Sequence, residues 1–312
     1  MATTTNSDMI IYNDQVQTAY FEKIQDVLEV FNAASKGAIV MRSEALPGDF
    51  TDESFYTIPG GIEHRDVDST GAATAKKLGS DEQHSVKSPW KYGPYETTEE
   101  AFKRRARSPE EFSQLLGEHM AEAMIAYSIG VSFAALEGAI GANEAMVAAG
   151  SFAADHKKVL TKGMRKFGDR FSRIAMFGMD SSTYFDLVDD AIDEKIYEEA
   201  GLVIYGGTPG TMGKPVLVTD TAPASKIFGL QVGAVQIVES QAPGIRSYNI
   251  DGRDNLMLGY QGEGAFNLEL LGYGWKKSAG ANPDKSTIGA GASWVKHASD
   301  DKLTAGVVIG LT

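Results

Sequence analysis

The chain has 312 residues, of which 29 are basic and 42 acidic, so its formal net charge is −13. With 43% hydrophobic residues it is too apolar to be wholly disordered. A pI near 4.9 argues against a protein that mainly grips nucleic acid, because phosphate binding needs a positive surface. The absence of cysteine excludes disulfides, thiolate metal sites and thiol nucleophiles.

Residues 1–42 form the first predicted unit, an N-terminal arm. Apolar residues recur there at three- and four-residue spacing, which is typical of an amphipathic helix. They are Val16, Tyr20, Ile24, Val27, Leu28 and Phe31. We therefore expect a helix over residues 9–37, followed by a short strand at 38–41. No secretory signal is predicted, because no basic region precedes an apolar core.

Residues 43–107 have an unusual composition for a compact domain. They are rich in Gly, Ser, Thr, Asp and Lys and poor in large aliphatic residues, so they cannot form a core of their own. Short alternations at 85–87 and 90–92 are typical of an exposed two-stranded ribbon. A structureless loop of this length is uncommon inside a compact domain. We expect an extended β loop that packs on a neighbouring chain, and a disordered insertion is the alternative.

The clearest local signal is Ser108-Pro109-Glu110-Glu111, which predicts the start of a helix. Ser108 can cap the helix, Pro109 suits its first position, and Glu111 completes a capping box. The apolar pattern continues to about residue 143 or 150, which gives a helix of about 50–60 Å. This length indicates a strut. Its most apolar part, 123–136, is too short to span a bilayer, so we expect no membrane contact.

Residues 151–261 are predicted to mix α and β structure, and residues 262–312 to be mostly β. We expect a helix over 154–167, a buried strand over 173–178, and a second helix capped by Asp180. Further strands are expected at 202–205, 215–219, 228–238, 266–275 and 303–311. The predicted fold class is therefore α+β.

No catalytic or metal-binding motif has the required spacing. The loop 207–215 resembles a phosphate-binding loop, but Thr208 stands where Gly is needed, and Pro215 where Ser or Thr is needed. The five histidines form no paired ligand motif. Ser88 and Lys91 match an acyl-enzyme spacing that works only on a helix, whereas the proline between them favours a loop. We expect no catalytic, cofactor-binding or metal-ligating residue.

A basic cluster directly precedes the long helix of this acidic chain. It comprises Lys103, Arg104, Arg105 and Arg107. The cluster lacks the interleaved aromatic residues of single-stranded nucleic-acid sites, so that function is less favoured. A contact with an acidic surface of a neighbouring copy is favoured, and ordinary surface charge is the alternative. Trp90 and Tyr92 on the extended loop are further candidates for contact between subunits.

In this order the units resemble a tailed-bacteriophage major capsid protein. The segments that carry the resemblance are Ile-Pro-Gly-Gly-Ile at 58–62, the helix start at 108–111, Gly-Lys-Pro-Val-Leu-Val-Thr-Asp at 213–220, 228–230 with 233–235, Leu-Gly-Tyr-Gly-Trp-Lys at 271–276, 282–283 and 293–294. The resemblance implies an N-terminal arm (1–42), an extended loop (43–107), a peripheral domain with a spine helix (108–152 and 262–312) and an axial domain (153–261). In an alternative assignment, the C-terminal strand belongs to the axial domain.

The resemblance also implies a function. Identical copies would form hexamers and pentamers that close into an icosahedral shell around double-stranded DNA, which an acidic protein contacts only weakly. The expected location is the virion capsid, after assembly in the host cytoplasm. The expected partners are a separate scaffolding protein, a portal and decoration proteins. No catalysis is implied.

Two alternatives stay open at this point. An encapsulin-type cellular shell protein would share the fold but hold enzyme cargo. A soluble enzyme would have an unrecognised site within residues 153–261, with residues 43–107 as a lid. Self-assembly into rings or shells would distinguish a capsid protein or an encapsulin from a soluble enzyme.

Overall fold

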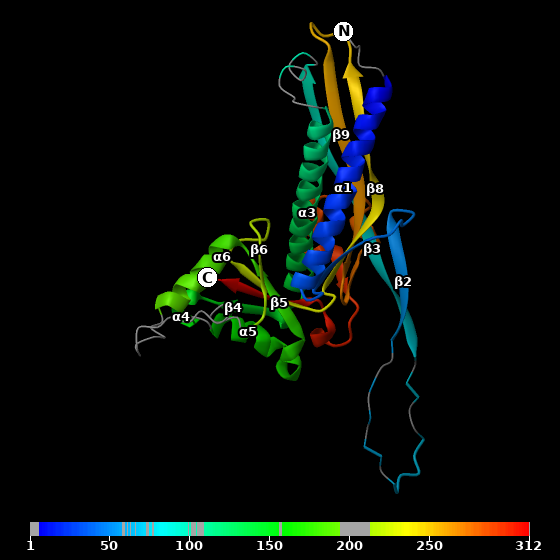
Figure 1. Ribbon diagram of the computed structural model, residues 1–312. Coiled ribbons are helices and arrows are strands. Elements are labelled where there is room, and N and C mark those ends of the chain that lie inside the picture. The colour runs from blue at the N-terminus through cyan, green and yellow to red at the C-terminus, as the bar shows by residue number, and fades with distance from the viewer. Residues whose placement is uncertain are drawn as a thin grey trace.

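The computed structural model describes residues 6–57, 60, 62, 64–65, 67–72, 75–76, 78–98, 100, 104, 109–155, 158–193 and 213–311. These residues form a long stem, a compact lobe beside its foot, and a narrow ribbon that projects beyond the foot (Figure 1). The stem and the lobe each contain both helices and strands, so the α+β class is confirmed.

The stem has two long helices that pack on a seven-stranded sheet. Its elements are α1 (Asn6–Ala34), β1 (Ile39–Ser43), β2 (Phe50–Thr57), β3 (Gly79–Thr98), α3 (Pro109–Gly141), β8 (Val235–Ile250), β9 (Met257–Leu270), β10 (Tyr273–Trp275), α7 (Lys285–Ile288) and β11 (Trp294–Lys296). The strand order is β1-β8-β9-β10-β11, and β3 pairs with both β9 and β2. Only β1 and β8 run parallel among these pairs.

The lobe is built on a five-stranded sheet in the order β4-β12-β7-β5-β6. Its elements are β4 (Val147–Gly150), α4 (Phe152–Asp155), α5 (Lys158–Lys166), β5 (Ile174–Met179), α6 (Ser181–Asp193), β6 (Val216–Val218), β7 (Lys226–Gln231) and β12 (Gly306–Leu311). Among the described residues, short 3₁₀ helices also lie at Glu144–Met146, Gly168–Arg173, Lys277–Ala279, Gly291–Ser293 and Asp301–Leu303.

The helix and strand predicted in the N-terminal arm are confirmed as α1 and β1. Val16, Tyr20 and Ile24 are buried, which is the face that their four-residue spacing predicts. This face packs on α3 and β8. The predicted arm therefore lies along the stem of its own subunit.

The predicted strut helix is confirmed as α3, which begins at Pro109 and ends at Gly141. By length and composition alone it could cross a membrane, but 72% of its most apolar window is buried inside the protein. Its C-terminal half joins stem to lobe, because Phe133 stacks edge-to-face on Phe228 of β7 at 5.1 Å. An ion pair between Lys226 and Glu137 lies beside this contact.

The single strand expected over residues 228–238 is wrong, because the chain turns there. β7 ends at Gln231 in the lobe sheet, and β8 begins at Val235 in the stem sheet. Gly233 between them has a φ of +70°, which favours glycine, and its N–H donates to the carbonyl of Gly37 at 2.7 Å. A similar turn at Gly272 (φ +78°) divides the expected strand 266–275 into β9 and β10.

The sheets do not follow the domain boundaries expected at residues 153 and 261. β4 precedes residue 153 but lies in the lobe, because it pairs with β12. β8 precedes residue 261 but lies in the stem, because it pairs with β9 along most of its length. The last strand joins the lobe, the option that the sequence left open. The expected strand 202–205 lies outside the described residues. That the stem is peripheral and the lobe axial stays a prediction.

Candidate subunit-contact surfaces

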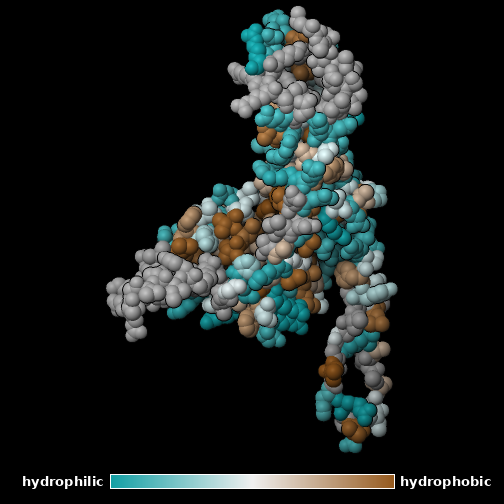
Figure 2. All heavy atoms as spheres, viewed as in Figure 1, coloured by the Kyte–Doolittle hydropathy of each residue, from teal (hydrophilic) through white to brown (hydrophobic). Residues whose placement is uncertain are grey.

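The ribbon consists of β2, the paired start of β3 and the described residues between them. Its strands pair antiparallel from Phe50 opposite Val86 to Thr57 opposite Gly79, so a two-stranded ribbon is present as predicted. Residues 90–92, which were expected in it, instead pair with β9 in the stem sheet. Large apolar side chains are exposed along it (Figure 2). They are Tyr56 (86% exposed), Ile62 (105%), Val67 (78%) and Leu78 (69%). These side chains gain burial only when another molecule covers them.

Hydrogen bonds and ion pairs hold the base of the ribbon against the foot of the stem. Gln83 Nε2 donates to the carbonyls of Leu270 at 3.2 Å and Tyr273 at 3.0 Å. Lys277 Nζ donates to Asp52 Oδ2 at 2.9 Å, and His297 Nδ1 lies 3.2 Å from Asp81 Oδ2. The direction in which the ribbon projects is therefore set by its own subunit.

Among the described residues, one cluster of His and carboxylate side chains is compact enough to hold a metal ion, and it lies at these contacts. Asp52, Glu82 and His84 have ligand atoms within 4.8 Å of one another. However, Asp52 already binds Lys277, and its other oxygen lies 2.7 Å from His84 Nδ1. Lys277, followed by His84, holds the pKa of Asp52 below its usual range. Both Asp52 oxygens are therefore already engaged, one by the Lys277 ammonium group and the other by His84.

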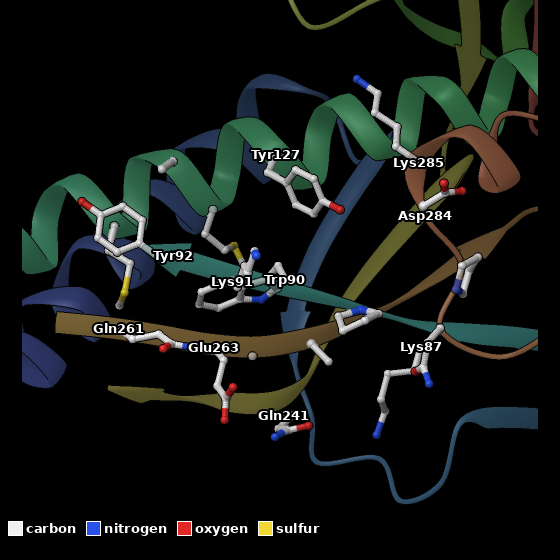
Figure 3. A pocket seen from close by; sticks show the side chains of 18 of the residues that line it. Lys87, Trp90, Lys91, Tyr92, Tyr127, Gln241, Gln261, Glu263, Asp284 and Lys285 are labelled. Atoms are coloured by element: carbon white, nitrogen blue, oxygen red, sulfur yellow. The ribbon is translucent and has the colours of Figure 1, made fainter. Parts of the chain in front are cut away.

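A groove of ≈ 990 Å³ runs along α3, above strands β3 and β9 (Figure 3). Its apolar lining comes from Trp90, Met120, Met124 and Tyr127. Charged side chains also line it: Lys87, Lys91, Glu263, Asp284 and Lys285. This composition, with an apolar interior and polar edges, is typical of a protein contact surface.

The structure brings the two aromatic candidates, Trp90 and Tyr92, to this groove. Trp90 is 9% exposed and lies over Gly264, where a Cβ atom would come within 2.6 Å of the indole. Its Nε1 is buried without a hydrogen-bond partner among the described residues. Tyr92 Oη lies 2.7 Å from His119 Nδ1, and burial, the main cause, raises the pKa of Tyr92 to about 12. That these residues touch another copy stays a prediction.

The basic cluster does not join this groove as far as it is described. Arg104 binds Glu100 at 2.8 Å, one helical turn away, and both side chains are largely exposed. Exposed ion pairs of this kind contribute little to stability. Lys103, Arg105 and Arg107 lie outside the described residues, so their role between subunits also stays a prediction.

Two features of the groove were missed in the sequence. Met120, Met124 and Tyr127 recur at helical spacing, which predicts a buried helix face. This spacing does not reveal that part of the face lines a groove. The prediction of a loop at Pro89 is wrong, because Pro89 lies within β3 opposite Ala265. Beyond Val86, β3 pairs with β9 alone among the described strands, and proline is tolerated at such an edge.

Comparison with known proteins gives a consistent result. The model of the family described as Major capsid protein 13-like matches residues 8–308. The capsid of cyanophage P-SCSP1u is similar in structure, with a TM-score of 0.52 and 10% identity over 88% of this chain and 86% of that chain. A structure from Mycobacterium phage Bobi has a TM-score of 0.52 and 13% identity, over 89% of this chain and 90% of that chain. The capsid of a native GTA particle has a TM-score of 0.53 and 13% identity, over 88% of this chain and 86% of that chain. No curated protein matches the chain significantly.

Proposed function

Because the chain belongs to the Major capsid protein 13-like family, we propose that it is the repeating subunit of an icosahedral phage head. Identical copies form hexamers and pentamers, and these close into a shell that encloses double-stranded DNA. The subunit acts by binding its neighbours, not by catalysis. Assembly takes place in the host cytoplasm with a separate scaffolding protein, and a portal and decoration proteins bind the shell.

The observation that carries this proposal is the exposed apolar ribbon. Its base is fixed by ion pairs and hydrogen bonds, yet its outer part exposes Ile62, Val67 and Leu78 to solvent. A monomer gains nothing from such a segment, whereas a neighbouring copy would cover it. The groove along α3 supplies a surface of matching character. The ribbon of one subunit therefore lies across the next subunit and places its apolar side chains in that groove.

The charge of the chain fits a container for DNA. A net charge of −13 keeps the average interaction with phosphate repulsive, so the shell holds its contents without binding them tightly. Packaged DNA can then be compacted and released.

Two charged substitutions in the ribbon test this function. Ile62→Asp with Val67→Asp places two carboxylates in the proposed contact, and desolvating them opposes assembly. We expect rings and shells to be lost, while the circular dichroism and thermal unfolding of the subunit stay unchanged, because both side chains are exposed. Assembly is measured by light scattering after size exclusion and by negative-stain imaging.

Thr70→Asp with Ala72→Asp is the matched control, since both residues are exposed in the same ribbon and the added charge is equal. We expect this control to assemble. Equal assembly by the two variants would show that the apolar ribbon residues make no contact between subunits.

A further inference from the structure

The lobe has sides of opposite charge. In Figure 1, α5 lies below the strands of the lobe and α6 lies above them. The lower side, formed by α5 and the 3₁₀ helix Gly168–Arg173, exposes basic residues: Lys158, Arg165, Lys166 and Arg173. The upper side, formed by α6, exposes Asp186 and Asp189, and α6 contains no basic residue.

The basic side is not neutralised by its own chain. Within the described part of the protein, Arg165, Lys166 and Arg173 form no ion pair, although neighbouring cations do. Lys162 binds Asp155 at 2.5 Å, and Lys302 binds Asp169 at 2.7 Å. Local carboxylates therefore pair with some cations of this side and leave three facing outward, which is unusual in a chain with an excess of acid.

Each side also exposes one phenylalanine beside its charges. Phe171 on the lower side is 48% exposed, and Phe185 on the upper side is 61% exposed. Figure 2 shows hydrophilic surface along the lower edge of the lobe and hydrophobic surface higher up, around α6. An exposed aromatic residue with polar residues around it is a common arrangement at protein contact surfaces.

We propose that the basic side of one lobe binds the acidic side of the lobe of the next copy. Because the two surfaces lie on opposite sides of one lobe, they cannot meet within a chain. A contact between different patches of identical copies is heterologous, and it closes into a ring when the rotation permits. Complementary charge would orient the copies, and the two phenylalanines would be buried between them. This inference rests on the proposed function, because it names the contact that forms each ring.

Charge reversal on either side tests the contact. Arg165→Glu with Lys166→Glu places two carboxylates on the basic side, and Asp186→Lys with Asp189→Lys places two ammonium groups on the acidic side. Each variant is expected to raise the subunit concentration needed for ring assembly roughly tenfold or more, because like charges then face one another. The four changes combined in one chain restore complementarity, so this variant is expected to assemble as the unchanged protein does.

Mixing the two double variants gives a sharper test. Each ring contact then needs one copy of each variant, so the copies must alternate around the ring. Alternation closes in rings with an even number of subunits and leaves a mismatched contact in rings with an odd number. The mixture is therefore expected to form hexamers but not pentamers, and so to give open sheets or tubes without closed shells.

Two results would overturn the inference. One is normal assembly by both double variants. The other is an equal loss of assembly in Arg246→Glu with Arg253→Glu, which reverses two exposed charges on the stem and would implicate net charge alone. If the basic side contacts packaged DNA instead, reversing the cations lowers DNA retention and the aspartate changes do not restore it. If the unchanged protein forms no rings at all, the proposed function fails instead.

Discussion

At the scale of single residues, the contact between Tyr20 and Glu239 is the most sensitive to pH. Tyr20 Oη donates to Glu239 Oε1 at 3.1 Å, and both side chains are buried between α1 and β8. Burial, the largest cause, raises the pKa of Glu239, although hydrogen bonds with Tyr20 and Ser43 act in the opposite direction. Burial also raises the pKa of Tyr20, so its hydroxyl stays protonated. The packing of α1 on the sheet therefore favours a neutral carboxyl.

Glu239→Gln tests this account. The folded-state pKa of Glu239 lies above its unfolded value, so its stabilising contribution is complete below the unfolded pKa and is lost as pH rises through the folded pKa. The glutamine variant keeps an acceptor for Tyr20 and cannot ionise. We expect its unfolding temperature to exceed that of the unchanged protein increasingly as pH rises from about 4 to about 8.

Glu263→Gln is the control, since Glu263 is an exposed glutamate on β9. Its unfolding temperature is expected to stay close to that of the unchanged protein, because a substitution at an exposed position removes few contacts. A pH-independent difference for Glu239→Gln would contradict the account.

At the scale of elements, the approach of α1 to α3 depends on Gly117. A Cβ atom there would lie 2.6 Å from the carbonyl oxygen of Val16 and 2.9 Å from Ala19 Cβ. The obstacle is backbone, so the helices would have to move apart. Gly117→Ala is expected to destabilise the protein by about 1–3 kcal/mol, although alanine favours a helix by about 1 kcal/mol.

Gly141→Ala is the matched control in the same helix, because nothing lies within 4 Å of its Cβ position. We expect it to be neutral or stabilised by up to about 1 kcal/mol. Urea unfolding of both variants measures the difference, and equal stabilities would show that α1 and α3 do not need this close contact.

The elements also show what could be predicted from the sequence. The start of α3 depends on local chemistry, since cap, proline and acidic residues lie within four positions. α3 is helical from Pro109, as predicted, and the expected cap Ser108 lies outside the described residues. The turn at Gly233 was not predicted, because apolar residues continue on both sides of it. β7 and β8 are distinguished only by the distant strands with which they pair. Strand partners are non-local, so composition alone could not assign β8 to the stem.

At the scale of the whole molecule, the sequence indicated the ribbon but not its surroundings. The shortage of large aliphatic residues in 43–107 was enough to predict a segment without its own core. The groove could not be predicted, because it forms where α3, β3, β9 and residues 282–285 meet. Trp90 was predicted as a contact residue from its place in an exposed ribbon, yet β9 covers much of its side chain.

Engineered cysteines test where the ribbon binds, because the natural chain has none. Ile62→Cys with Tyr127→Cys places one thiol on the ribbon and one in the groove. We expect disulfide-linked multimers when assembled particles are oxidised, since the contact would bring the two Cα atoms within about 7 Å. Ile62→Cys with Leu256→Cys is the control, because Leu256 is exposed at the far end of the stem. Equal cross-linking in both would place the ribbon elsewhere.

If the chain is a capsid subunit, its copies build a closed shell. The most direct measurement is the mass of the purified protein by light scattering after size exclusion, with negative-stain images of the same fractions, first alone and then with its scaffolding partner. The account predicts rings or megadalton shells. A chain that remains monomeric near 33.5 kDa with that partner present would contradict it.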